Sequence, residues 1–386
     1  MVMKDVKIVI GANYGDEGKG LLTRYFAKQV NNPIIIFHNG SAQRGHTVDY
    51  NPQFRHVYHH FGCGTADGVP TFFADSFWVH PMEFVREYCE LAQNGIYPIT
   101  YCDPYAPVVT PFDMLIDHAT EAWIAYERGE REYGSCGLGT WCAIEGRGYK
   151  NVFKIKDYHE ALTIENIDLL HYMLEQSWNE CCAQLIARKV DVDCLPEYKD
   201  YFTPNSWKKK NLISHFIDDL RFFLNKTQFM TFDQVYNRFN MIFEGAQGLG
   251  LDMNVDSDWH TTSNTGLTNP MNLIKNYNDF KAEVCYVTRS YATRHGLGEM
   301  ENETVKKEIN ADMFDKTNVH NEFQGSLRYG YPEDKDMISR VNKDFNIAIG
   351  DARFNKSIAV THCNEFPNFN QDALYLSNNP YSVFKK

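Results

Sequence analysis

The sequence predicts an α/β fold in which a central, mostly parallel sheet carries helical insertions. Short apolar runs rich in β-branched residues end at loops, and segments with helical spacing of their apolar residues lie between them. Strands that alternate with helices are joined by crossovers, so neighbouring strands run parallel and helices cover both faces. The 386 residues allow two or three ordinary domains or one large one. We expect one α/β domain over residues 1–386.

The individual elements follow from these patterns in chain order. Val6–Ile10 and Pro33–Phe37 are apolar runs that predict buried strands, with a helix over Lys19–Val30 between them. Further helices are predicted over Met82–Asn94, Asp113–Glu130 and Ser206–Phe223, and further interior strands over Asn240–Glu244 and Val284–Thr288. The polar, helical stretch from about 149 to 236 predicts a helical subdomain.

Composition and charge narrow the classes of function. A formal net charge of -12 provides no basic surface for a phosphate backbone, so we expect no nucleic-acid partner. No run approaches the roughly 20 apolar residues of a membrane span, and the first apolar run is too short for a signal peptide. The ten cysteines include no CxxC pair, which suits reduced thiols. We therefore expect a cytoplasmic protein with no membrane partner.

The segment Gly11–Gly20 has the features of a phosphate-binding loop. Its glycines let backbone N–H groups face an anion, the following helix adds partial positive charge, and Lys19 adds a full charge. Gly20 stands where a P-loop kinase or GTPase needs Ser or Thr, which argues against those classes. Asp16 predicts a metal ligand, a general base or both. A polar turn with an acidic first helical turn is the structural alternative.

A second polar segment, Asn39–Thr47, follows the second predicted strand. Loops at the carboxyl ends of neighbouring parallel strands meet at one crevice, so this segment is expected to face the first loop. His46 in this segment can contact a phosphate or a developing oxyanion. Taken alone, such a residue is more often a loop histidine with structural hydrogen bonds.

Gly15–Gly20 and Gly45–Thr47 resemble the corresponding loops of adenylosuccinate synthetases. Three further blocks resemble that family in the same order, namely Phe243–Gly248 with Leu251–Asp252, Thr261–Thr265 and Ser290–Gly296. The resemblance extends from about residue 6 to residue 380 and is weakest in the helical middle. It implies a ligase that joins the amine of L-aspartate to C6 of a 6-oxopurine mononucleotide, using a nucleoside triphosphate. It also implies Mg²⁺ as cofactor and a homodimer.

The same resemblance implies a role for each matched residue. Asp16 would take the proton from purine N1 and, with the Gly45 carbonyl, hold Mg²⁺, while His46 would stabilise the transferred phosphoryl group and Lys19 would hold phosphates. The nucleoside triphosphate would contact Gly15, Glu17, Gly18, Lys19, Gly20, Gly45, His46, Thr47, Asn364 and Pro380. The purine mononucleotide would contact Asn13, Asp16, Gln43, Arg44, Ser135, Cys136, Lys150, Gln247, Thr261 and Thr262. L-aspartate would contact Gly325, Ser326, Leu327 and Arg328. Arg147 or Lys150 would lie near the arginine that family members extend across the dimer interface.

Two departures from the family pattern bear on the substrates. Cellular members carry a Thr-Lys-x-Asp block that reads guanine, whereas this chain has Thr361–Glu365, which favours ATP or dATP unless Glu365 replaces the lost aspartate. The arginine-rich loop that binds aspartate keeps one arginine here, Arg328. Both changes resemble the bacteriophage branch of the family, which uses dGMP in place of IMP to make the precursor of 2-aminoadenine in the host cytoplasm.

Asp16 is retained here, although a small residue is expected at that position in the phage branch. A carboxylate can accept both N1–H and N2–H of guanine, so we predict dGMP ahead of IMP. An adenylosuccinate synthetase that acts on IMP with GTP or ATP is the alternative. A non-catalytic nucleotide-binding protein is the alternative from another class, because the aspartate loop has lost arginines.

Overall fold

The computed structural model describes residues 3–129, 135–147, 152–164, 166–300, 302–313, 315–316, 320, 325–332, 334–366 and 372–386. Across these ranges ten strands form one sheet in the order β15-β14-β13-β9-β1-β8-β2-β5-β6-β7. In chain order they are β1 (Lys4–Gly11), β2 (Pro33–Phe37), β5 (Thr71–Phe73), β6 (Thr100–Cys102), β7 (Thr227–Phe229), β8 (Asn240–Gly248), β9 (Phe280–Arg289), β13 (Phe354–Thr361), β14 (Tyr375–Asn379) and β15 (Ser382–Lys385). Among these neighbours only β14 and β15 are antiparallel. The predicted α/β class with a mostly parallel sheet is confirmed.

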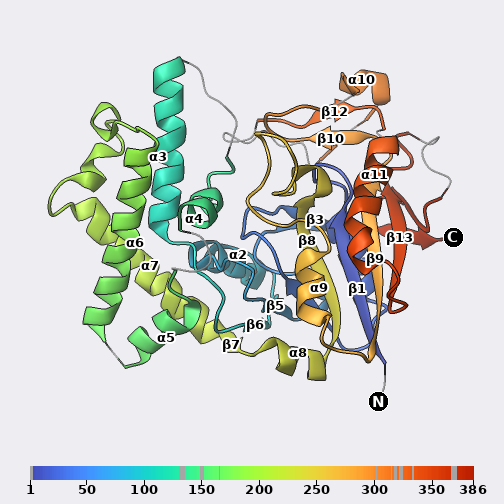
Figure 1. Ribbon diagram of the computed structural model, residues 1–386, viewed down its shortest axis with the longest axis horizontal. Helices are drawn as coiled ribbons and strands as arrows, with labels where there is room; N and C mark the ends of the chain where they lie inside the picture. Colours follow the sequence, from blue (N-terminus) through green and yellow to red (C-terminus); the bar gives the residue numbers. More distant parts are fainter. Residues whose placement is uncertain are drawn as a thin grey trace.

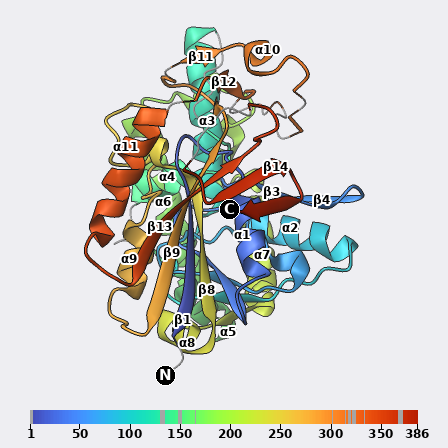
Figure 2. The ribbon, with the colours of Figure 1, turned by 90° about the vertical axis from the view of Figure 1, so that its right-hand side faces the viewer.

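Helices cover both faces of this sheet (Figures 1 and 2). They are α1 (Lys19–Ala27), α2 (Pro81–Gln93), α3 (Pro111–Arg128), α4 (Thr140–Arg147), α5 (Ile155–Thr163), α6 (Ile167–Ala187), α7 (Trp207–Lys226), α8 (Phe232–Arg238), α9 (Thr268–Ile274), α10 (Lys306–Ile309) and α11 (Asp334–Phe345). Figure 2 shows α9 and α11 on one side of the strands and α1, α2 and α7 on the other. Two small sheets accompany the large one: the hairpin β3 (His46–Asn51) and β4 (Phe54–Tyr58), and the set β10 (Ala292–Arg294), β11 (Glu303–Thr304) and β12 (Arg328–Gly330).

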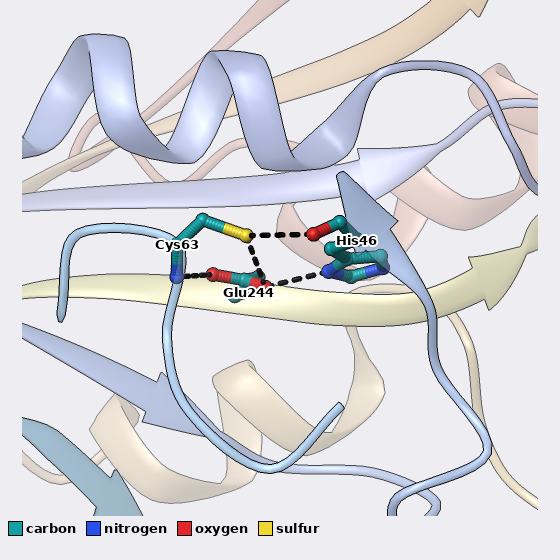
Figure 3. Close-up of side chains that lie close together, drawn as sticks. All are labelled: His46, Cys63 and Glu244. Atoms are coloured by element: carbon teal, nitrogen blue, oxygen red, sulfur yellow. Dashed lines mark hydrogen bonds and ion pairs between the residues drawn. The ribbon is translucent and has the colours of Figure 1, made fainter. Parts of the chain in front are cut away.

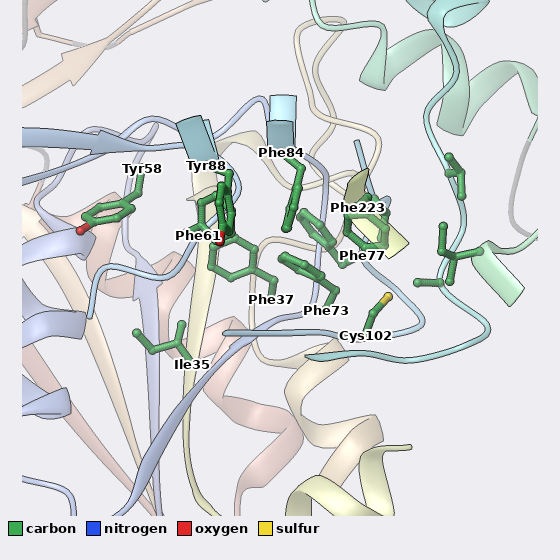
Figure 4. Close-up of a cluster of buried hydrophobic side chains, with 14 of the residues drawn as sticks. Ile35, Phe37, Tyr58, Phe61, Phe73, Phe77, Phe84, Tyr88, Cys102 and Phe223 are labelled. Atoms are coloured by element: carbon green, nitrogen blue, oxygen red, sulfur yellow. The ribbon is translucent and has the colours of Figure 1, made fainter. Parts of the chain in front are cut away.

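The core lies on both faces because the side chains of a strand alternate between them. Ile35 and Phe37 of β2 belong to one hydrophobic cluster, and Ile34 and Ile36 of the same strand belong to a second. The first cluster includes a group of aromatic rings between the sheet and helices α2 and α7 (Figure 4). Burial on both faces explains why the strand sequences are continuously apolar and do not alternate with polar residues.

The predicted elements exist, and all but Pro33–Phe37 have shifted ends. α1 stops at Ala27, three residues before its expected end, and the chain then turns at Asn32, whose φ of 48° is left-handed. β8 continues beyond Glu244 to Gly248, because it stays paired with β1 as far as the contact between Gly11 and Gly248. The longer β8 carries Gln247 up to the loop that follows β1, and this places it beside the site.

The segment between β6 and β7 contains α3 to α7 and lies to one side of the sheet (Figure 1). It leaves the sheet after Cys102 and returns at Thr227, where β7 pairs with β6 as an edge strand. The predicted helical stretch from about 149 to 236 falls mostly within it and ends in α8. A search of the described residues found no helix with the length and apolar character needed to span a bilayer.

Candidate functional site

A cleft of about 1020 Å³ opens at the carboxyl ends of β1, β2, β8, β9 and β13. The crevice beyond these strand ends is where ligands bind in open α/β sheets. Fifteen of the residues predicted from the sequence line it: Gly15, Asp16, Glu17, Gly18, Lys19, Gly20, Gln43, Arg44, Gly45, His46, Thr47, Cys136, Gln247, Asn364 and Pro380. The structure therefore brings together loops that lie more than 300 residues apart in the chain.

Glu17, not Asp16, occupies the interior of the phosphate-type loop. Its Oε1 accepts hydrogen bonds from the backbone N–H groups of Asn13, at 2.8 Å, and Gly15, at 3.1 Å. Its Oε2 lies 2.8 Å from Nζ of Lys19, and both side chains are 2% exposed. The carboxylate thus takes the Gly15 amide and the Lys19 ammonium group, which the sequence assigned to phosphate, together with the amide of Asn13.

Asp16 points into the cleft with 29% of its side chain exposed. Its backbone is left-handed, with φ of 59°, and its carbonyl oxygen accepts a hydrogen bond from Nε of Arg289. Arg289 is itself buried and paired with Asp315 at 2.6 Å. Nε2 of His295 lies 3.7 Å from Oδ2 of Asp16. Asp16 is therefore held by its main chain while its carboxyl group stays accessible.

His46 forms a buried hydrogen-bonded group with Glu244 and Cys63 (Figure 3). Its Nδ1 lies 2.5 Å from Oε1 of Glu244, which leaves Nε2 as the nitrogen that can meet a ligand in the cleft. Burial lowers the pKa of His46, against the opposing effect of Glu244. Burial favours neutral Glu244, yet the hydrogen bond from His46 and the charge of Arg44 hold its pKa below the ordinary value. Because a carboxylate only accepts hydrogen bonds, Nδ1–H of the imidazole is the donor to Glu244.

Gln247 carries a feature typical of a ligand contact. Its backbone is left-handed, with φ of 59°, and its side-chain oxygen Oε1 is buried without a hydrogen-bond partner among the described residues. A buried acceptor without a partner costs about 1–3 kcal/mol, which a ligand that donates a hydrogen bond would recover. Gln247 lines the cleft.

Two other predicted purine contacts have structural partners. Arg44 is buried over the ring of Phe37 and donates to the backbone carbonyls of Asn39 and Glu244. Gln43 accepts a hydrogen bond from Ser41 N–H at 2.6 Å through Oε1. Both residues line the cleft, but these bonds hold the loop itself.

Four predicted purine contacts lie outside the cleft lining, and a fifth, Lys150, lies outside the described residues. Asn13 is buried between Thr288 and Arg340, and Ser135 accepts a hydrogen bond from Gly137 N–H. Thr262 is buried and Thr261 is half-buried, and neither reaches the cleft surface.

Arg147 is buried, in contrast to the expected arm across a dimer interface. It pairs with Asp113 at 2.5 Å and donates to the backbone carbonyl of Val108. Its side chain is 2% exposed, so it holds α4 against α3 within the chain.

None of the four predicted aspartate-binding residues lines the main cleft. Arg328 lines a separate cavity of about 650 Å³ that includes Trp259, Glu299 and Met300. Its guanidinium pairs with Glu303 and donates to the carbonyls of residues 296 and 298. Leu327 packs in a small hydrophobic cluster. Ser326 contacts His320 at 3.3 Å, and Gly325 has a left-handed φ of 71°.

The segment Thr361–Glu365, which replaces the guanine-reading block, lies at the cleft. Asn364 donates from Nδ2 to Oε1 of Glu365 at 2.9 Å, and Asn310 donates to Oε2 of the same carboxylate at 2.7 Å. Both oxygens of Glu365 therefore already have donors.

Sequence reasoning missed several residues of the site, among them Cys63, Glu244, Arg289 and His295. Glu244, Arg289 and His295 stand inside or beside blocks that resemble the family. The sequence of a strand does not show which of its side chains points toward the site, so these residues could not be selected from it. Cys63 carries no signal in the sequence, because its role depends on contact with Glu244, 181 residues away.

The fit of the residues to Mg²⁺ can be judged from their donor atoms. The carboxylate of Asp16 and the backbone at Gly45 both line the cleft, and carboxylate and carbonyl oxygens are the hard ligands that Mg²⁺ prefers. The exposed carboxyl group of Asp16 is thus available to the ion, whereas Glu17 is already occupied by Lys19.

The fold and the cleft define an α/β protein with a P-loop-like strand, loop and helix at the carboxyl edge of a parallel sheet. The family model described as Adenylosuccinate synthetase matches residues 8–328. The chain therefore belongs to the adenylosuccinate synthetase family.

Curated relatives and solved structures are similar to this chain at low identity. The adenylosuccinate synthetase of Mesoplasma florum is 23% identical over 75% of this chain and 63% of its own length, and that of Prochlorococcus marinus strain MIT 9515 is 26% identical over 64% and 52%. The chain thus spans about half to two thirds of their lengths.

Two solved structures share the fold. The fully ligated adenylosuccinate synthetase of Plasmodium falciparum has a TM-score of 0.66 at 18% identity, covering 92% of this chain and 76% of that one. Cyanophage S-2L succinoaminodeoxyadenylate synthetase (PurZ), bound to dGMP and to dATP as an energy donor, has a TM-score of 0.61 at 13% identity, covering 99% and 95%.

Proposed function

We propose that this protein is a ligase that joins L-aspartate to C6 of a purine mononucleotide at the expense of a nucleoside triphosphate. The observation that carries the proposal is the convergence of Asp16, Lys19, His46 and Gln247 on one cleft. An accessible carboxyl group beside a phosphate-type loop supplies a base, and the imidazole across the cleft supplies a group for phosphoryl charge.

The chemistry assigns each of these residues a task. Asp16 takes the proton from purine N1, which leaves the negative charge on O6, and O6 then attacks the γ-phosphorus of the triphosphate and displaces the nucleoside diphosphate. Nε2 of His46 meets the phosphoryl oxygens, and Glu244 stabilises positive charge on the ring as it develops. The amine of L-aspartate then displaces phosphate at C6. Mg²⁺ bound by Asp16 and the Gly45 carbonyl would neutralise phosphate charge.

Phosphate binding requires a rearrangement in the first loop. Lys19 and the amides of Asn13 and Gly15 are held by Glu17 in the free protein. We propose that the triphosphate competes with this carboxylate for the ammonium group of Lys19. Gln247, with its buried and unpartnered Oε1, would accept a hydrogen bond from the purine nucleotide.

We propose dGMP as the purine and ATP or dATP as the energy donor, which makes N6-succino-2-amino-2'-deoxyadenylate. Two observations support this choice. This chain aligns with 95% of the phage enzyme that binds dGMP and dATP, but with 76% of the Plasmodium enzyme. In addition, Asn364 stands where the family reads guanine, and Glu365 is already bonded to Asn364 and Asn310. A homodimer in the cytoplasm of a phage-infected host belongs to the same proposal.

IMP is the second candidate substrate, because Asp16 is retained and its carboxyl group faces the cleft. A non-catalytic nucleotide-binding protein is the candidate from another class. The pairing of Arg328 with Glu303 favours it, because the expected aspartate ligand is occupied.

The test is a matrix of IMP, GMP and dGMP against ATP, dATP and GTP with Mg²⁺, with and without L-aspartate. Phosphate release and product mass are measured. The proposal expects release only when all three substrates are present, with dGMP and an adenine triphosphate fastest. Asp16→Asn should lower the rate about 10²- to 10⁴-fold, whereas Asp49→Asn, at another acid of the cleft wall, should not. Nucleotide binding without aspartate-dependent release would favour the non-catalytic alternative.

A further inference from the structure

Three side chains from separate segments meet below the cleft: His46 at the start of β3, Cys63 in the loop after β4, and Glu244 in β8 (Figure 3). Oε1 of Glu244 lies 2.5 Å from Nδ1 of His46 and 3.2 Å from Sγ of Cys63. Oε2 of Glu244 accepts the backbone N–H of Cys63 at 3.0 Å. Cys63 therefore contacts both oxygens of the carboxylate to which the His46 imidazole is hydrogen-bonded.

The Glu244 carboxylate is completely buried, so its charge depends on the donors around it. A buried ion needs donors on its free lone pairs, and here they come from one imidazole N–H, one amide N–H and one thiol. Burial, reinforced by the Glu244 carboxylate, raises the pKa of the Cys63 thiol well above its usual range. The thiol therefore keeps its proton and acts as a donor.

The thiol lies against Gly20 of α1. A Cβ added to Gly20 would lie 3.0 Å from Sγ of Cys63 and 2.9 Å from the carbonyl oxygen of Thr47. A serine or threonine at position 20, as in P-loop proteins, would therefore crowd this thiol.

We propose that Cys63 is a positioning residue that fixes the Glu244 carboxylate, and through it the imidazole of His46. The thiol and the imidazole share Oε1, so the loss of the thiol removes one of the two donors to that oxygen and leaves the carboxylate held by Nδ1 of His46 and the backbone N–H of Cys63. With one restraint fewer on Glu244, the imidazole is held less firmly in its direction toward the cleft. The consequence for the reaction rests on the proposed function, whereas the consequence for the imidazole does not.

The first test compares Cys63→Ala with Cys63→Ser, because serine restores an O–H donor and alanine does not. Cys63→Ala should lower kcat about tenfold with little change in the KM for either nucleotide, because a donor to a charged acceptor is lost without loss of a substrate contact. Cys63→Ser should stay within about threefold of the parent. Cys102→Ala is the matched control: it removes another fully buried thiol, which lies in β6 within the hydrophobic cluster of Figure 4 and does not line the cleft, and it should leave kcat unchanged.

The second test does not need turnover. Histidine labelled with ¹⁵N reports the Nδ1–H of His46 by NMR, and a short bond to a carboxylate moves that proton to low field. The resonance should shift in Cys63→Ala, return in Cys63→Ser and stay unchanged in Cys102→Ala. If the parent shows the resonance but no aspartate-dependent phosphate release, the proposed function fails and the positioning role stands.

Three results would overturn the positioning role. One is a Cys63→Ala variant with the kcat and resonance of the parent. Another is a Cys63→Ser variant as slow as Cys63→Ala, which would assign the effect to volume. The third concerns a metal, since the donor atoms of the three residues lie within 4.8 Å of one another. One equivalent of zinc in the purified protein, lost in Cys63→Ser, would make the group a metal site instead.

Discussion

The ammonium group of Lys19 lies 2.8 Å from the carboxylate of Glu17, two residues earlier in the same loop, and both side chains are 2% exposed. In this pair, an acidic and a basic side chain of the phosphate-type loop neutralise each other. An internal carboxylate therefore fills part of the position that the loop offers to an external anion, and under the proposed function a triphosphate would replace it.

Glu17→Gln tests this closure. Removal of one partner leaves a buried charge without compensation, so the free energy of unfolding should fall by about 3 kcal/mol. A saturating nucleoside triphosphate should recover much of that loss, because its phosphates neutralise Lys19. Denaturant titration with and without nucleotide measures both quantities. Asp67→Asn removes a partner of Arg24 at the more exposed end of α1 and should cost about 1 kcal/mol or less.

Glu244→Gln should lower kcat about a hundredfold or more, because the neutral amide no longer stabilises positive charge on His46. The KM values for the nucleotides should change little. Glu87→Gln is a matched control, since Glu87 is equally buried and accepts hydrogen bonds from the backbone of residues 59 and 60. Equal losses in both variants, measured by initial rates, would point to a general effect on folding.

Arg147→Met should destabilise the chain without changing its oligomeric state. Asp113 would remain buried without its partner, at a cost of about 3–5 kcal/mol. Thermal unfolding measures this loss, and sedimentation velocity measures the assembly. Dissociation of a dimer with unchanged protomer stability would instead support the arm across the interface that the family resemblance implies.

Arg328→Gln tests whether the second cavity serves L-aspartate. If Arg328 leaves Glu303 to bind a substrate carboxylate, the KM for L-aspartate should rise about tenfold or more while the KM values for the nucleotides stay constant. Steady-state kinetics, with each of the three substrates varied in turn, measure these KM values. Arg353→Gln removes a comparable exposed pair, with Asp351, and should leave all three constants unchanged. An unchanged KM for aspartate in Arg328→Gln would make the pair with Glu303 structural.

Local patterns sufficed for four of the ten strands of the large sheet, β1, β2, β8 and β9, and for the two loops of the cleft, whereas β5, β6, β7, β13, β14 and β15 were not predicted. Pro33–Phe37 was predicted to the residue, because its apolar run is bounded by polar turns on both sides. The pattern could not decide which of two adjacent acids enters the first loop. That choice depends on the left-handed backbone of Asp16, which is held by Arg289, 273 residues further along the chain.

Side chains of the site were harder to predict than its loops. Arg44 was expected to face a nucleotide, yet it packs on Phe37 and bonds to backbone carbonyls. The residues that support His46 come from β8 and from the loop after β4. Such contacts depend on the order of strands in the sheet, which periodicity does not encode.

The long segment between β6 and β7 departs from and returns to the rim of the sheet, and its two ends are neighbours there. Insertions or deletions within it leave the registers of β1, β8 and β9 untouched, so the reacting groups keep their places. Within this segment, Cys136 and Leu138, which lie between α3 and α4, line the cleft. Changes in the length of this segment can therefore alter the access of ligands to the cleft without moving the strands that carry the candidate site residues.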